Sequence, residues 1–384
     1  MDLEKPDRTP VFCQLSLGHY MLHTDFEPYR IWFSSETFAD ALRTLAQRYH
    51  FDGILVNLPG RCRDWEKHIV RMERKNHETR IDWDDGSYSI CPDNDNVHHF
   101  RKDRLPALEE VDPDTLYYIE PHDITGVTYP YYYGFTDDDN TYTAVDESGF
   151  FPDYCTDTLR ILVRKSGGMH HISGEVFSPF SQLMEMFDYE TVLLALVDTP
   201  EHVLRLLERL SSGAAHWGLL QVDAGADAIL VSSAFAGGGF ISYDHYRRFV
   251  LPFERALVGR IHDNADVPVY VHTCGSIGDR IDLMIEAGYD GIDTMDPPPL
   301  GNTDIGWVKE EYGADLFLKG NIDPVNVLLR GKVTDVYEKA VELIETAGYN
   351  GGYILSSACS VAPEVSPKNL EMLYRASIDS AASL

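Results

Sequence analysis

The chain has 384 residues, 44% of them hydrophobic, so it is long and apolar enough to bury a globular core. Its 62 acidic and 32 basic side chains give a formal net charge of −30, and such a surface repels nucleic acid and anionic membranes. No apolar run approaches the roughly 20 residues of a membrane span, and the polar N-terminus is unlike a signal peptide. Six scattered cysteines favour a reduced, cytoplasmic setting over a disulfide framework.

Short apolar runs typical of buried strands alternate along the chain with amphipathic runs typical of helices. The predicted strands are residues 10–15, 53–57, 169–175, 228–232, 269–275, 291–293, 315–319 and 353–359. The predicted helices are residues 37–49, 179–196, 200–222, 242–262 and 366–376. Strands and helices in alternation form parallel sheets, and eight strands predict a (β/α)8 (TIM) barrel. We therefore expect residues 1–384 to form a single α/β domain.

Residues 60–166 interrupt this alternation between the second and third strands. The stretch is rich in Asp, Asn, Gly and aromatic residues and is too long for a bare loop. It predicts an inserted β-rich subdomain or lid within the barrel. Tyr132 lies in its aromatic run YPYYYGF (residues 129–135) and is a candidate for binding a flat substrate. The alternative is that these tyrosines pack inside the insertion.

Polar side chains follow many of the predicted strands. In a (β/α)8 barrel the catalytic groups stand at the carboxyl ends of the strands. The residues at or just after these ends are Gln14, Asn57, Glu175, Ser232, His272, Cys274, Asp293, Asn321 and Cys359. The amide, hydroxyl and aspartate members of this set, Gln14, Asn57, Ser232, Asp293 and Asn321, are candidates for substrate binding.

The run VYVHTCG places His272 and Cys274 two residues apart on one predicted strand, and Cys359 ends another. Alternate residues on a strand face the same way, so the first two side chains can aim at one point. A closed barrel would bring the distant cysteine to the same mouth. One imidazole and two thiolates form a zinc ligand set with a position left for chemistry. Glu175 is a candidate fourth ligand, and the alternative is ordinary core cysteines beside a structural histidine.

The chain from about residue 174 to the C-terminus resembles the uroporphyrinogen decarboxylase superfamily. The stretches that match are SYDHYRRFVLP (242–252), HTCG (272–275), KGNIDP (319–324) and APEVSPKNL (362–370). True decarboxylases of the superfamily carry an arginine-rich motif after the first strand and an aspartate that faces the pyrroles. Here the corresponding stretches read QLSLGHY (14–20) and VSSA (231–234), without arginine or aspartate. These departures and the charge of −30 argue against a porphyrinogen decarboxylase.

The other branch of the superfamily is the corrinoid-dependent methyltransferases. Those that use zinc resemble this chain in carrying His-x-Cys and a distant Cys, at positions that match His272, Cys274 and Cys359. The resemblance implies that a methyl group moves between a small substrate and the cobalt of a corrinoid (cobalamin) held by a partner protein. The substrate is either a methyl ether, typically a methoxy-aromatic that is O-demethylated, or a thiol such as coenzyme M. The alternatives are a porphyrinogen decarboxylase and a barrel that binds a small ligand or corrinoid without turnover.

Overall fold

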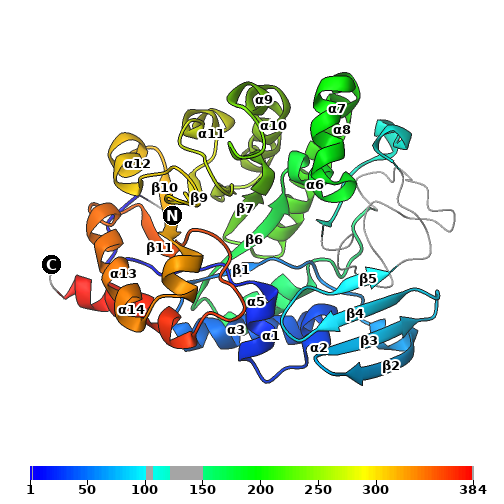
Figure 1. Ribbon diagram of the computed structural model, residues 1–384, viewed down its shortest axis with the longest axis horizontal. Coiled ribbons are helices and arrows are strands. Elements are labelled where there is room, and N and C mark those ends of the chain that lie inside the picture. The colour runs from blue at the N-terminus through cyan, green and yellow to red at the C-terminus, as the bar shows by residue number, and fades with distance from the viewer. Residues whose placement is uncertain (2, 101–106, 122–149, 383–384) are drawn as a thin grey trace.

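The computed structural model describes residues 1, 3–100, 107–121 and 150–382. Its centre is a curled, all-parallel sheet of seven strands in the order β1-β6-β7-β8-β9-β10-β11, with helices on its outer side (Figure 1). Every neighbouring pair in the sheet is parallel. The strands are β1 (Gly53–Val56), β6 (His171–Phe177), β7 (Ala228–Ser232), β8 (Val269–His272), β9 (Gly291–Thr294), β10 (Phe317–Ile322) and β11 (Tyr353–Ser357). Seven of the eight predicted strands therefore form this sheet.

Helices connect successive strands of this sheet. The α-helices are α1 (Leu17–His23), α2 (Pro28–Phe33), α3 (Ser35–Tyr49), α5 (Asp157–Ser166), α6 (Pro179–Phe187), α7 (Tyr189–Asp198), α8 (Pro200–Asp223), α9 (Tyr243–Phe249), α10 (Leu251–His262), α11 (Ile281–Ala287), α12 (Ile305–Tyr312), α13 (Val333–Ala347) and α14 (Pro367–Ala381). Short 3-10 helices are η1 (Trp65–His68), η2 (Leu108–Glu110), η3 (Pro113–Thr115) and η4 (Ala234–Ala236), and η5 (Pro324–Leu329) is a π-helix.

Two predicted helices are each broken in two. The predicted helix 179–196 is α6 and α7, because Asp188 adopts φ 58° and its carboxylate accepts from the Thr191 N–H as the N-cap of α7. The predicted helix 242–262 is α9 and α10, which meet at Val250, just before a proline in the first turn of α10. A proline fits the first turn of a helix and interrupts its interior, so both breaks have a local cause.

The predicted first strand, residues 10–15, is not a continuous strand but lies between β11 and β1. The Phe12 N–H donates to the Leu355 carbonyl (3.1 Å), and the Leu355 N–H donates to the Pro10 carbonyl (2.9 Å). On its other side, the Asp52 N–H donates to the Val11 carbonyl (2.8 Å). Pro10 lacks an N–H and shortens the ladder. The segment thus bridges the two edge strands of the curled sheet.

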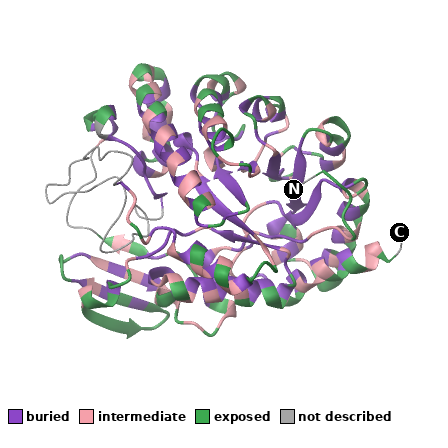
Figure 2. Ribbon diagram, turned by 180° about the vertical axis from the view of Figure 1, so that it is seen from behind, coloured by how far each residue is buried: buried purple, intermediate pink, exposed green. Residues whose placement is uncertain are grey.

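The concave side of the sheet holds a small apolar cluster of its own. Its buried members are Phe12, Leu55, Ala228, Leu230, Tyr270, Phe317 and Ile354. A much larger apolar core fills the space between the sheet and the helices. Figure 2 shows the result, with buried strands inside and helices that are buried on one face only. Alternate residues of a strand share a face, so a residue two positions after a cluster member on the same strand also points to the concave side.

Part of the predicted insertion, residues 60–166, forms a separate antiparallel sheet. Its strands are β2 (Ile69–Lys75), β3 (Glu78–Trp83), β4 (Tyr88–Pro92) and β5 (His98–Phe100), in that order. They lie to one side of the parallel sheet (Figure 1). The last ten residues of the predicted range are α5, which packs against α3. Residues 101–106 and 122–149, including Tyr132, lie outside the described part of the chain.

No helix among the described residues has the length and hydropathy that crossing a membrane requires.

Candidate metal centre

His272 is the last residue of β8, and Cys274 follows it after one residue. Tyr270 belongs to the concave apolar cluster, so His272, two residues later, points to the same side of the sheet. The histidine is 5% exposed, and the cysteine is partly buried. The imidazole therefore lies on the concave side, at the carboxyl end of β8 and next to the apolar cluster.

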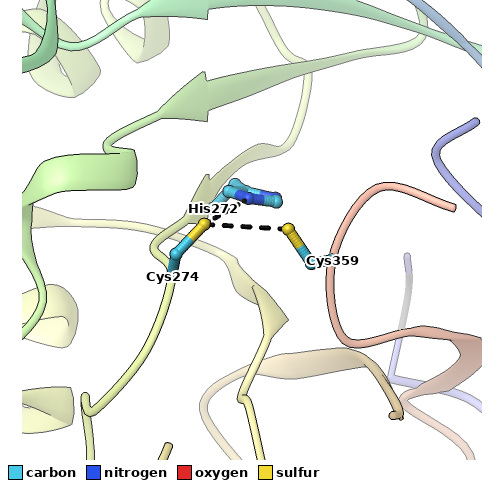
Figure 3. Close-up of side chains that lie close together, drawn as sticks. All are labelled: His272, Cys274 and Cys359. Atoms are coloured by element: carbon cyan, nitrogen blue, oxygen red, sulfur yellow. Dashed lines mark hydrogen bonds between the residues drawn. The ribbon is translucent and has the colours of Figure 1, made fainter. Parts of the chain in front are cut away.

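Cys359 comes from the loop that follows β11 and meets the other two side chains. The Cys274 sulfur lies 3.4 Å from His272 Nε2 and 3.8 Å from the Cys359 sulfur. One nitrogen and two sulfurs lie within 4.8 Å of one another, and no other group of three or more His, Cys, Asp or Glu ligands does so among the described residues. Figure 3 shows the three side chains turned toward one another. The structure thus brings together the three residues that the sequence predicts as a set.

These spacings fit a tetrahedral zinc ion. Bonds of about 2.3 Å to sulfur and about 2.0 Å to nitrogen place two sulfurs about 3.8 Å apart and a nitrogen about 3.5 Å from a sulfur. The observed separations are 3.8 Å and 3.4 Å. Soft thiolates with an imidazole favour zinc over magnesium or calcium. Three protein ligands leave the fourth position for an exchangeable group.

The three groups perturb one another's protonation. Burial disfavours an imidazolium, but the Asp293 carboxylate and the Cys359 sulfur outweigh it and raise the pKa of His272 to about 10. The hydrogen bond with Cys274 lowers the pKa of the Cys359 thiol, with burial opposing the shift. The same hydrogen bond, followed by burial, raises the pKa of Cys274. A metal must displace the remaining protons, so its affinity for this site rises with pH.

A buried ion pair stands beside the histidine. Asp293 Oδ2 lies 3.5 Å from His272 Nδ1 and 2.8 Å from Lys319 Nζ. Burial alone would raise the pKa of Asp293, but the lysine and the histidine together hold it below its usual value. The lysine ammonium also lies 4.7 Å from the centre of the Phe12 ring. The carboxylate is therefore ionised and faces the imidazole nitrogen that points away from the sulfurs.

The turn after β9 contacts the segment that holds Cys274 on both sides of that residue. The Thr294 hydroxyl donates to the Thr273 carbonyl (2.8 Å), and the Gly275 N–H donates to Asp296 Oδ2 (2.7 Å). Burial raises the pKa of Asp296 to about 6, partly offset by the Gly275 hydrogen bond. The cysteine is thus held by a neighbouring loop rather than by its own strand alone.

The loop after β7 also approaches Cys274. A Cβ atom on Gly237 would lie 2.2 Å from the Cys274 carbonyl oxygen, so only glycine fits. Arg280, 1% exposed, donates to the Ala236 carbonyl (2.7 Å) and the Ile241 carbonyl (3.2 Å). The glycine run at 237–239 therefore allows a close backbone approach that an arginine anchors.

The structure places the other candidate site residues in varied surroundings. Glu175 is not in the group of three ligands, and its carboxylate accepts from the Ser232 hydroxyl one strand away. Asn321 donates to the Met295 carbonyl (2.8 Å) and is buried. Gln14 Oε1 and Asn57 Oδ1 are buried without a hydrogen-bond partner among the described residues. These last two are the candidates with free capacity to bind a substrate.

Sequence reasoning missed Lys319, Asp296 and Thr294. Lys319 lies within the apolar strand β10, where a charged residue two positions after Phe317 indicates an inward-facing cation. The sequence shows that signal, but it does not show that Asp293 is the partner of Lys319, because the register of β9 and β10 determines the pairing.

Comparisons with known proteins show which family the chain belongs to. The family model for uroporphyrinogen decarboxylase (URO-D) matches residues 136–379. The chain belongs to the uroporphyrinogen decarboxylase family. Among its curated relatives are proteins named uroporphyrinogen decarboxylase from Alkalilimnicola ehrlichii, 26% identical over 225 residues, and Geobacter metallireducens, 27% identical over 224 residues. Each match covers 56% of this chain and 59% or 62% of the relative, so the chain spans about three-fifths of their length.

Solved structures extend the likeness to the whole chain. A methyltransferase from Methanosarcina mazei superposes with a TM-score of 0.69 at 16% identity, covering 98% of this chain and 95% of its own. A putative vitamin-B12-independent methionine synthase from Listeria monocytogenes gives a TM-score of 0.50 at 12% identity, with 99% of both chains covered. At these identities the likeness is one of fold. The uroporphyrinogen decarboxylase family member described here thus shares its architecture with a methyltransferase.

Proposed function

We propose that this member of the family is a zinc-dependent methyltransferase that moves a methyl group between a small substrate and the cobalt of a corrinoid carried by a partner protein. The observation that carries the proposal is the convergence of His272, Cys274 and Cys359 at the carboxyl edge of the parallel sheet. The fold likeness to the Methanosarcina mazei methyltransferase supports it. The proposal includes a closed (β/α)8 barrel in which residues 10–15 act as the first strand.

The residues of the chain have distinct tasks in this proposal. His272, Cys274 and Cys359 hold the zinc, which supplies a Lewis acid that polarises a methyl ether oxygen or stabilises a substrate thiolate. Two thiolates and a neutral imidazole make the zinc site formally neutral, which suits exchange of a soft or oxygen donor better than generation of hydroxide. The unpaired Gln14 Oε1 and Asn57 Oδ1 accept hydrogen bonds from the substrate at the same edge.

The second candidate is a porphyrinogen decarboxylase, which the names of the sequence relatives favour. That reaction requires cations to hold several substrate carboxylates. The stretch 14–20 holds no arginine, and Ser232 and Ser233 stand at the end of β7. Incubation with uroporphyrinogen distinguishes the two reactions. We expect no coproporphyrinogen, and its formation would replace the methyl-transfer proposal by decarboxylation.

The methyl-transfer reaction is tested with zinc-loaded protein, using methylcobalamin when a thiol is the methyl acceptor and reduced cob(I)alamin when a methoxy-aromatic is the methyl donor. A panel of thiols and methoxy-aromatics is added, and the absorbance of the corrinoid reports loss or gain of its methyl group. Cys359→Ser is the inactive comparison, and Cys155→Ser is the matched control because Cys155 is buried away from the three ligands. We expect turnover with at least one substrate in the wild type and control only. Zinc binding without turnover across the panel would favour a binding protein instead.

A further inference from the structure

We propose that Asp293 and Lys319 are a positioning pair for the metal ligands, acting through His272 and through the turn that follows β9. The inference rests on the proposed zinc site, and it assigns a task to two residues that lie outside the group of three ligands. Its physical content is that the imidazole is held in one orientation before the metal arrives, with Nδ1 toward the carboxylate, and that Nδ1 keeps its proton when the metal displaces the proton on Nε2.

The pairing register of the sheet brings these side chains into one row. His272 pairs with Asp293 across β8 and β9, and Asp293 pairs with Lys319 across β9 and β10. His272 and Lys319 point to the concave side, since Tyr270 and Phe317, two residues earlier on their strands, belong to the concave cluster. Asp293 lies between them and contacts both side chains. Neighbouring strands lie about 4.8 Å apart, so side chains on the same face of paired strands are within reach of direct contact.

The two ring nitrogens of His272 face different partners, in an orientation that suits metal binding. His272 Nε2 faces the Cys274 sulfur (3.4 Å), while Nδ1 lies 3.5 Å from Asp293 Oδ2. A carboxylate at Nδ1 favours a proton on that nitrogen, so the lone pair of Nε2 is left for the metal. The Nδ1 contact is long for a hydrogen bond, and contacts of this kind shorten when the site is filled.

Folding stability alone does not explain the ion pair. Asp293 and Lys319 are each 1% exposed, and a buried ion pair of this kind is weak support for stability because desolvation offsets its attraction. The ammonium contacts Asp293 Oδ2 (2.8 Å) and keeps the carboxylate charged inside the sheet. A charged carboxylate is the stronger acceptor for the imidazole N–H.

The same segment also holds the second ligand. Thr294 and Met295 adopt φ values of 86° and 52°, a conformation that side-chain-bearing residues rarely take. That turn allows the Thr294 hydroxyl to reach the Thr273 carbonyl and Asp296 to accept from the Gly275 N–H. The two contacts bracket Cys274, so the segment that begins at Asp293 orients both His272 and Cys274. Backbone in this conformation is typical of functional sites.

The test compares Asp293→Asn, Lys319→Met and the double variant with wild type. Lys309→Met is the matched control, since Lys309 is also buried and donates to the Gly351 carbonyl (2.7 Å), away from the three ligands. Zinc affinity is measured by competition with a chromophoric chelator, and the d–d absorption of the cobalt(II)-substituted protein reports ligand geometry. Thermal unfolding of the metal-free proteins separates loss of folding from loss of positioning.

We expect Asp293→Asn to weaken zinc binding about 10- to 100-fold and to shift the cobalt spectrum, because partners of metal ligands have effects of this size. The double variant removes both buried charges, so it should unfold near the wild-type temperature yet bind zinc as weakly as Asp293→Asn. Wild-type affinity and spectrum in the double variant, or an equal loss in Lys309→Met, would overturn the inference while the zinc site stands. A wild-type protein that binds no zinc would instead overturn the proposed function.

Discussion

Replacing Cys359 by serine should abolish the stabilisation of the protein by zinc. A ligand present at about 1,000 times its Kd stabilises a folded protein by about 4 kcal/mol. Partners of metal ligands contribute about 10- to 100-fold to affinity, so losing a ligand thiolate costs on the order of 1,000-fold. The same free zinc then equals the new Kd and stabilises the variant by only about 0.4 kcal/mol. The cysteine belongs to the only group of three or more such ligands among the described residues, so no second site there would mask the loss.

These energies translate into a measurable difference in unfolding temperature. For 384 residues the unfolding entropy is about 0.8 kcal/mol per kelvin, so zinc should raise Tm by about 5 °C in wild type and about 0.5 °C in Cys359→Ser. Calorimetry of metal-free protein in zinc-buffered solution measures both, with Cys155→Ser as the control that should keep the wild-type shift. An equal zinc-dependent shift in Cys359→Ser and Cys155→Ser would refute the reasoning.

Three further predictions concern the surroundings of the site. Burial raises the pKa of Glu254 from 4.5 to about 7. The folded state therefore binds a proton that the unfolded state releases above pH 4.5, and this proton contributes about 3 kcal/mol to the free energy of unfolding. The contribution is fully present below pH 4.5 and is lost as the pH rises through 7. Urea titrations at pH 5 and pH 8 measure this loss as a difference in the free energy of unfolding. The difference should shrink in Glu254→Gln, and a difference equal to that of the wild type would contradict the prediction. Gly237→Ala should weaken zinc binding, because its Cβ would lie 2.2 Å from the Cys274 carbonyl oxygen; unchanged affinity in chelator competition would argue against this close approach. Glu175→Gln should retain one zinc per chain by elemental analysis, because Glu175 bonds to the Ser232 hydroxyl and lies outside the ligand group, whereas loss of zinc would make it the fourth ligand.

Much of the parallel sheet could be predicted from the sequence because its strands are short, apolar and separated by helix signals. The predicted strand 228–232 coincides with β7, and 53–57 differs from β1 by one residue. Residues 10–15 were harder, because Pro10 leaves too few ladder bonds for a continuous strand although the segment lies between β11 and β1. The helix breaks at Asp188 and Val250 depend on local capping and proline geometry that periodicity does not register.

The metal-ligand set could be predicted because strand alternation fixes His272 and Cys274 relative to each other without any tertiary information. Predicting that Cys359 lies near these two residues also required a prediction of the fold, which the alternation of strands and helices allowed. The pair of Asp293 and Lys319 could not be found in this way, because two residues on different strands meet only when the register of β9 and β10 is known. Glu175 was placed at the right edge of the sheet, but its side chain turns to Ser232 rather than to the sulfurs.

The most direct test of the central claim is zinc analysis combined with X-ray absorption at the zinc edge on purified wild-type protein. The account predicts one zinc per chain, with two sulfur ligands at about 2.3 Å and one imidazole nitrogen at about 2.0 Å. Protein without zinc after metal reconstitution, or a zinc with only oxygen and nitrogen neighbours, would contradict it.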